Sequence, residues 1–154
     1  MNGQGEGYNY NQNETFEGGA GNDSLSGGTG SDTYLFDLGD GEDVVAEMGG
    51  TDKVIFGEDI DNEDLMFARE GNHLKISVIG QEDSITISNY YYNNSYKVES
   101  FQTADGSMLD YTKLDLMIQA MASFEDETGM MWQDAVQNNN EQANDIINQW
   151  WTKE

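Results

Sequence analysis

Four aspartates recur at a nearly constant spacing in the first third of the chain and are the side chains best suited to bind a cation. Asp23 and Asp32 are nine residues apart. The same interval separates Asp43 from Asp52. Each follows a glycine-rich stretch, where glycine adopts positive φ angles that turn successive carbonyl oxygens toward one point. Such oxygen ligands suit Ca²⁺, which takes about 6–8 of them, better than Mg²⁺ or a transition metal.

The aspartates belong to an internal repeat of nine residues. Two perfect copies read G-G-x-G-x-D-x-U-x, where U is a large apolar residue. Two degraded copies, displaced by the insertion Phe36-Asp37, keep the fourth, sixth and eighth places. A vestigial copy keeps only Glu14 and Phe16, as an atypical terminal repeat would. In chain order, the vestigial, perfect and degraded copies are residues 9–17, 18–26, 27–35, 38–46 and 47–55.

The repeat predicts a short parallel β-roll. The first six residues of each copy form a turn, and the last three form a strand whose apolar residue points into a narrow core. The four core residues are Leu25, Tyr34, Val45 and Val54. Two copies complete one coil, so Asp23 stacks on Asp43 on one side, with an ion between them. On the other side Asp32 stacks on Asp52, and Glu14 completes an outer site beside Asp32.

The charge balance excludes several classes of partner. Six basic residues oppose 30 acidic ones, which gives a formal net charge of −24. Nucleic acid and anionic membranes are excluded because binding them needs a basic surface. Residues 17–64 hold 14 acidic residues and one basic residue, so this segment should repel itself without metal, and calcium binding and folding should be one event.

The alternative interpretation of the repeats is a flexible glycine-rich linker. A linker does not need apolar residues at regular intervals, so the repeat pattern favours the roll.

The sequence contains neither the disulfides nor the N-terminal signal peptide that many exported proteins have. It has no cysteine, so disulfides cannot stabilise the fold, and we expect bound metal to do so. It also has no proline. The start MNGQGEGYNYNQ has neither a basic nor an apolar region of a signal peptide. No apolar run reaches the roughly 18 residues that cross a bilayer. Export would therefore depend on a signal elsewhere in the chain.

After Phe56 an alternation of apolar and polar residues predicts further strands. These are expected at residues 65–68, 74–78, 85–87 and 96–102. Thr112 and Asp115 have the spacing of a capping box, which predicts that a helix begins there. The apolar face of that helix would hold Leu114, Met117, Met121 and Phe124. In the tail a second amphipathic stripe consists of Ala143, Ile146, Ile147, Trp150 and Trp151.

The predicted fold class is therefore β-dominated, with C-terminal helices. We expect four segments: an N-terminal flank with the vestigial repeat, the roll, a β-rich capping region that ends in a helix, and a C-terminal tail. Their bounds are residues 1–17, 18–56, 57–124 and 125–154. The repeat block begins abruptly, which suggests that the chain is cut from a longer one.

The chain resembles the RTX (repeats-in-toxin) family through the runs GGAGNDSLSGGTGSDTYLFDLGDGEDVV, GGTDKVIF, DLMFAREGNHLKISVIGQEDSITISNYY and VESFQTADGS. The resemblance covers about residues 16–124. It is most specific for the final repeat block and capping region of adenylate-cyclase-type and haemolysin-type toxins and of large iron-regulated or adhesive RTX proteins. It implies calcium binding, export from a bacterium by a type I secretion system through an uncleaved C-terminal signal, and folding outside the cell. The tail would carry that signal.

The same resemblance implies a ligand set for calcium. It consists of aspartate side chains and of carbonyl oxygens in the glycine-rich loops. The residues that the resemblance assigns to metal are Gly18, Ala20, Asn22, Asp23, Gly27, Thr29, Ser31, Asp32, Gly39, Gly41, Asp43, Gly49, Thr51 and Asp52.

His73 and four tyrosines are among the other residues whose types could take part in catalysis or ligand binding. His73, the only histidine, lacks a nearby nucleophile and orienting partner, so we expect no catalysis. The tyrosines Tyr90, Tyr91, Tyr92 and Tyr96 are expected to cover the sheet, but they could also stack on a sugar. The expected partners are calcium ions and the type I secretion machinery, and the chain is expected to be a monomer. An adhesin-like module, or one of a polysaccharide-modifying enzyme, that binds a glycan or host surface is the alternative function.

Overall fold

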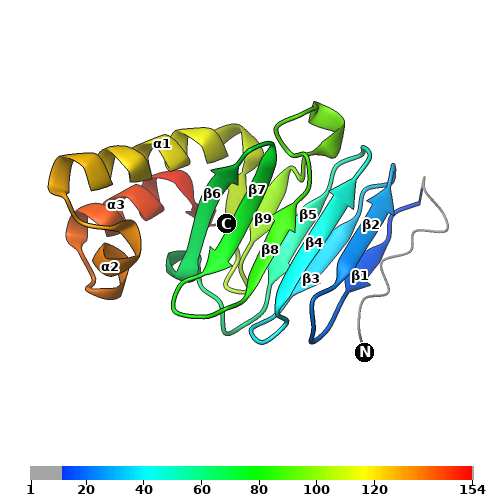
Figure 1. The fold of residues 1–154 in the computed structure, drawn as a ribbon, viewed down its shortest axis with the longest axis horizontal. Coiled ribbons are helices and arrows are strands. Elements are labelled where there is room, and N and C mark those ends of the chain that lie inside the picture. The colour runs from blue at the N-terminus through cyan, green and yellow to red at the C-terminus, as the bar shows by residue number, and fades with distance from the viewer. Residues whose placement is uncertain (1–11, 154) are drawn as a thin grey trace.

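The computed structural model describes residues 12–153 and contains two β-sheets and three C-terminal helices (Figure 1). The strands of the roll are β1 (Thr15–Glu17), β2 (Ser24–Gly28), β3 (Thr33–Phe36), β4 (Glu42–Glu47) and β5 (Lys53–Phe56). The strands that follow are β6 (Leu65–Glu70), β7 (His73–Val78), β8 (Ser84–Ile87), β9 (Ser100–Gln102), β10 (Ser107–Asp110) and β11 (Thr152–Lys153). The helices are α1 (Tyr111–Thr128), α2 (Trp132–Gln137) and α3 (Glu141–Trp150), and short 3-10 turns are η1 (Asn62–Asp64) and η2 (Asn94–Tyr96).

The repeats form the predicted parallel roll. The chain alternates between two sheets, so β1, β3 and β5 pair in one and β2 and β4 in the other, all in parallel. Phe16 is in register with Tyr34, one coil along the chain, and Tyr34 with Val54. The eighth-place residues of the four copies are all buried, with at most 2% of their surface exposed. The predicted fold class and the predicted core of the roll are confirmed.

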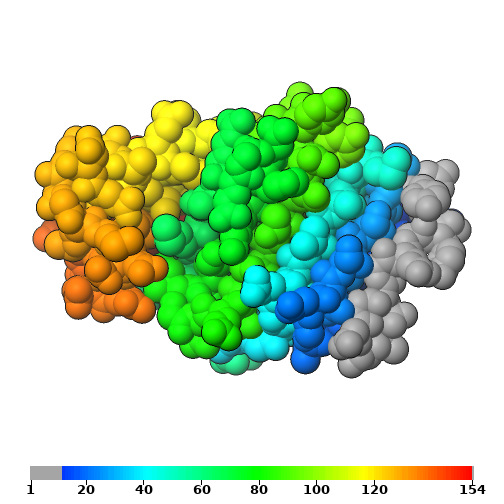
Figure 2. All heavy atoms as spheres, in the orientation of Figure 1, coloured from blue at the N-terminus to red at the C-terminus, as the bar shows by residue number. Residues whose placement is uncertain are grey.

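The capping region continues both sheets of the roll. Strand β8 pairs in parallel with β4, and β9 pairs in parallel with β5. Beyond these strands the pairing becomes antiparallel, in the hairpins β6–β7, β7–β8 and β9–β10. Figure 2 shows these segments as neighbouring diagonal bands, with the helices gathered at the end away from the first repeats. The cap therefore covers the last coil and prevents its strands from becoming open edges.

Two local predictions after the hairpins are wrong. The strand expected at residues 96–102 begins only at Ser100, because Tyr96 lies in η2. Helix α1 begins at Tyr111 without a capping box at Thr112: its N-cap is Asp110, whose side chain bonds no backbone amide of the helix. Asp110 is also the last residue of β10, so the strand leads directly into the helix. Asp115 instead accepts a hydrogen bond from the Tyr91 hydroxyl at 2.9 Å.

The helices cover the end of the cap and hold the tail against it. The predicted apolar face of α1 is confirmed, since Leu114, Met117, Met121 and Phe124 are buried. Trp151, just beyond α3, is 6% exposed and its ring centroid lies 6.1 Å from that of Phe67. None of the helices in the described part of the chain is long and apolar enough to cross a membrane.

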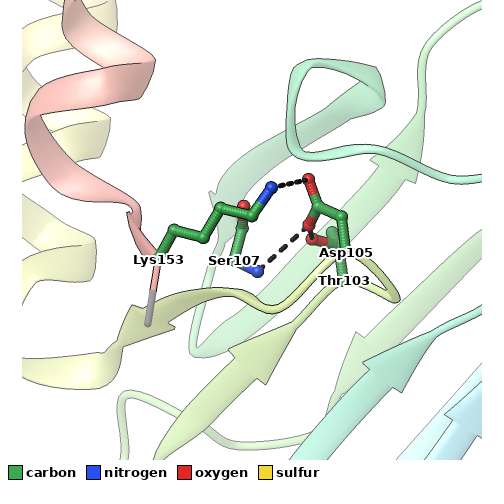
Figure 3. Close-up of polar contacts among 4 residues, drawn as sticks. All are labelled: Thr103, Asp105, Ser107 and Lys153. Atoms are coloured by element: carbon green, nitrogen blue, oxygen red, sulfur yellow. Dashed lines mark hydrogen bonds and ion pairs between the residues drawn. The ribbon is translucent and has the colours of Figure 1, made fainter.

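The tail ends as a strand of the sheet. Strand β11 pairs antiparallel with β10, where Ser107 is opposite Lys153. Figure 3 shows the Lys153 ammonium reaching the Asp105 carboxylate, 3.6 Å away, in the turn before β10. The other Asp105 oxygen accepts bonds from the Thr103 hydroxyl at 2.6 Å and from the Ser107 amide at 3.0 Å. These bonds lower the pKa of Asp105 to about 2, led by the Thr103 hydroxyl.

Candidate metal centre

The glycine-rich turns of the roll lie along two edges. The first, which we call the Asp23 edge, contains the turns of residues 18–23 and 38–43. The second, the Asp32 edge, contains the turns of residues 27–32 and 47–52. Each turn leads from one sheet into a strand of the other, so turns 20 residues apart in sequence are neighbours in space. All fourteen residues expected to bind metal lie in these four turns.

The sixth-place aspartates stack as predicted. The Asp43 carboxylate accepts a hydrogen bond from the backbone amide of Asp23 at 2.9 Å. On the other edge the Asp52 carboxylate accepts one from the Asp32 amide at 2.8 Å. Each bond uses only one oxygen of the receiving carboxylate. The stacking is therefore a ladder in which a second oxygen remains for another ligand.

Several of these remaining oxygens are buried without a partner. The Oδ2 atoms of Asp23, Asp32 and Asp52 accept no hydrogen bond from the described residues, and the three side chains are at most 5% exposed. A buried carboxylate oxygen without a donor is unfavourable, by several kcal/mol for a whole ionised group. The donor set is oxygen only, which Ca²⁺ prefers. These residues therefore fit a calcium ion.

Glycine is required in these turns where atoms of neighbouring groups take the place of a side chain. A Cβ on Gly27 would lie 2.3 Å from Asp32 Oδ2 and 2.4 Å from the Tyr34 hydroxyl. Gly50 has φ of 103°, and a Cβ there would lie 2.0 Å from the carbonyl oxygen of Gly30. Because Gly27 has no Cβ, it leaves room for the Asp32 carboxylate. Because Gly50 has none, its turn can stack closely on the turn that contains Gly30.

The Asp32 edge also holds a carboxylate that sequence reasoning missed. Glu47 occupies the first place of its copy, where the pattern has glycine, and is 1% exposed. One carboxylate oxygen from each of Asp32, Glu47 and Asp52 lies within 4.8 Å of the others. Two unit charges about 5 Å apart repel by roughly 3 kcal/mol at an effective dielectric constant of about 20. The three groups therefore need protons or a cation nearby.

Burial shifts the acid strength of these groups in the same direction. Desolvation raises the pKa of Asp43 to about 6. It also raises the pKa of Asp32, Glu47 and Asp52, and neighbouring carboxylates add to the increase. The raised pKa values describe buried carboxylates that form no ion pair with the residues that the structure describes.

The cap ends each ladder with an acidic residue of its own. Glu99, just before β9, accepts the Asp52 amide at 2.7 Å, so it takes the place of a further sixth-place aspartate. Asp83, just before β8, accepts the amides of Gly39 and Gly41, both at 2.9 Å. At the other end Glu14 donates its amide to Asp32, as its predicted position requires. The repeat pattern predicted Glu14 beside Asp32 but contains no signal for Glu99 or Asp83.

The histidine and the tyrosines that the sequence singled out lie outside the turns of the roll. His73 is exposed, and its Nδ1 accepts the backbone amide of Asn89 at 3.0 Å. Tyr90 is buried, with the Lys97 ammonium 4.7 Å from its ring centre. Tyr92 differs, because 68% of its surface is exposed and its ring stacks on Tyr96 with centroids 6.1 Å apart.

Comparison with known proteins agrees with this geometry. Residues 8–45 match the RTX calcium-binding nonapeptide repeat in four copies, and residues 73–113 match the haemolysin-type calcium binding protein related domain. The degraded copy at residues 47–55 lies outside both matches, although the structure includes it in the roll.

Two curated proteins illustrate the similarity. The chain is 35% identical to iron-regulated protein FrpA of Neisseria meningitidis serogroup C in an alignment of 94 residues that covers 56% of this chain. It is 31% identical to the plasmid hemolysin of Escherichia coli in an alignment of 85 residues that covers 51% of this chain. The matched part is only 8% of each relative's own length. The chain therefore contains RTX calcium-binding nonapeptide repeats that lead into a segment matching the haemolysin-type calcium binding protein related domain.

Proposed function

We propose that this module folds when it meets calcium outside the bacterial cell and so drives the folding of a larger secreted, toxin-like protein. The supporting observation is the ladder of buried aspartates, whose second oxygens lack donors within the described chain. In the metal-bound form the ions would lie between stacked turns, held by the four sixth-place aspartates and by carbonyl oxygens of the other ten residues assigned above. Bound calcium supplies positive charge, and the residues supply its oxygen shell.

The experiment is a calcium titration followed by circular dichroism. We expect a metal-depleted sample to lack most of the β signal and to gain it cooperatively as calcium rises to about 10 mM, above the weakest extracellular affinities. The same β content in excess chelator and in calcium would contradict the proposal. A magnesium titration is the control, because Mg²⁺ demands a tighter octahedral shell.

The tail is proposed to act as the uncleaved signal for type I secretion. Its apolar residues, including Ile147 and Trp151, are buried only because α3 and β11 dock on the cap. Before folding, this amphipathic segment is free for a transporter to bind. Signal function and folding would therefore use the same side chains at different times.

Secretion can be tested in cells that carry a haemolysin-type transporter. We expect the full chain in the medium and a variant without residues 129–154 inside the cell. A full-length variant with Asp32→Asn and Asp52→Asn is the matched control, because it keeps the tail but folds poorly. Export of the truncated chain would contradict a signal in the tail.

A glycan-binding surface is the second candidate, favoured by the exposed Tyr92–Tyr96 stack. A surface hollow of about 390 Å³ beside it is lined by Tyr91, Tyr92, Asn93, Asn94 and Lys97. Aromatic faces beside amide groups are suited to the apolar face and hydroxyls of a sugar. A glycan array probed in calcium with the wild type and Tyr92→Ala would test it: binding lost in the variant supports the idea, and silence removes it.

The proposed role is binding and folding without catalysis, and we expect a monomer. Size-exclusion chromatography with light scattering in calcium would test the oligomeric state.

A further inference from the structure

The carboxylate of Glu47 is the strongest feature that the repeat pattern leaves unexplained. Glycines fill the first place in both perfect copies, and at Gly18 and Gly27 an added Cβ would meet the aspartate of the same copy at 2.7 and 2.3 Å. Glu47 fills this place in the last copy and directs its side chain into the roll, where it is 1% exposed. Glu47 occupies a buried position of a strand in which buried and exposed residues alternate, and a buried glutamate needs a partner of opposite charge.

The protein fixes Glu47 in place but does not neutralise it. One of its oxygens accepts the Tyr34 hydroxyl, and the other accepts the Met48 amide at 3.0 Å. Both donors are uncharged, so neither offsets the negative charge of the ionised carboxylate. The ion pair found among residues 12–153 joins Lys153 to Asp105, so in this part of the chain no lysine or arginine pairs with Glu47.

The unpartnered aspartate oxygens converge on the same place. Asp32 Oδ2 and the Tyr34 hydroxyl both lie within 2.4 Å of the point where a Gly27 Cβ would be, so they are near neighbours. That hydroxyl donates to Glu47, which places Asp32 Oδ2 beside the glutamate. Asp52 completes the group with an Oδ2 that is also buried and without a donor, on a side chain 1% exposed. The cluster thus includes two unpartnered, buried oxygens as well as three acidic residues.

We propose that Asp32, Glu47 and Asp52 together bind one calcium ion at the Asp32 edge, and that Glu47 makes this the tightest site of the roll. This inference rests on the proposed calcium-dependent folding and adds a ligand that the nonapeptide pattern lacks. The number of charged ligands sets calcium affinity. The Asp23 edge has no third carboxylate in the corresponding place, because Leu38 is there, 41% exposed.

The test compares calcium binding of the full chain by calorimetry in three forms: wild type, Glu47→Gln and Glu42→Gln. Glu42 is the matched control, because it lies on the same strand, is exposed and loses the same charge. We expect Glu47→Gln to weaken the tightest binding at least ten-fold and Glu42→Gln to leave it within two-fold. Equal isotherms for the two variants would overturn the inference.

A second measurement covers the case in which Glu47→Gln folds poorly. Glu47→Gly restores the residue of the perfect copies, and it should fold in high calcium but bind its first ion more weakly. Terbium, a calcium mimic excited through nearby tyrosines, should emit strongly at the first equivalent in the wild type and weakly in Tyr34→Phe. If Glu47→Gly binds as tightly as the wild type, Glu47 is not a ligand. If the wild type itself binds no calcium, the proposed function fails instead.

Discussion

The two edges of the roll are formed by the same nine-residue pattern, but different acidic residues lie beside their turns. The Asp32 edge forms a continuous register of acidic residues from Glu14 to Glu99 and contains the buried Glu47. The Asp23 edge has one aspartate pair, and its last turn is held by Asp83 through two glycine amides instead of a sixth-place amide. The comparison teaches that copies of one repeat acquire different acidic neighbours from the segments that stack beside them.

Substituting the aspartates of one edge at a time should produce the largest difference between the two edges. We expect Asp32→Asn with Asp52→Asn to raise the calcium concentration needed for folding by more than ten-fold. Asp23→Asn with Asp43→Asn should raise it less, because Leu38 takes the place of Glu47 at that edge. Circular dichroism during calcium titration measures both midpoints. Equal shifts would mean that the edges are equivalent.

Alanine substitutions at two stacked glycines should show the next largest effect. Gly50→Ala combines a positive φ with a carbonyl oxygen 2.0 Å from the new Cβ, and Gly41→Ala meets one at 2.8 Å. Backbone strain costs about 1–3 kcal/mol, and overpacking adds a similar amount. We expect Gly50→Ala to be the more destabilising in calcium-saturated thermal unfolding. Gly39→Ala is the control for strain alone, because nothing lies within 4 Å of its Cβ.

The two ends of the ladders can be separated by substituting the cap residues. Glu99→Ala should speed amide exchange of Asp52 and leave Gly41 protected, and Asp83→Ala should do the reverse. Each loses hydrogen bonds to a charged acceptor, which are worth about 1.5–3 kcal/mol apiece when buried and less when partly exposed. Hydrogen exchange by NMR in calcium reads both amides. If either substitution affects both edges equally, the ladders are coupled through the cap.

The smallest expected effect is on pH dependence without metal. Burial raises the folded-state pKa of Asp43 to about 6, and those of Glu47 and Asp52 also rise. A carboxyl group that binds protons more tightly when folded stabilises the fold at low pH, and this stability is lost as pH rises through the folded pKa. Metal-depleted protein should therefore show more β structure near pH 5 than near pH 8. The opposite trend would contradict the raised pKa values.

Much of the roll was predictable from local signals. The apolar residue at the eighth place predicted four buried side chains, and the spacing of the aspartates predicted which pairs stack. The start of α1 was not predictable from Thr112, because pairing of β10 with β9 extends the strand to Asp110. Strand pairing within the β9–β10 hairpin decided that boundary, whereas the capping residues suggested another.

The sequence by itself determined the coil, the preference for calcium and the stacking of the sixth-place aspartates, because a nine-residue period repeats the same backbone geometry and the same oxygen donors in every copy. Only the tertiary structure decided the partners of each edge. Glu47 appears in the sequence as a defect in the pattern. It joins Asp32 and Asp52 because it ends β4 and begins the turn that leads to Asp52, and the parallel pairing of β3 with β5 stacks that turn on the turn of Asp32. Glu99 lies 47 residues from Asp52, and only the pairing of β9 with β5 brings its carboxylate to the end of the ladder.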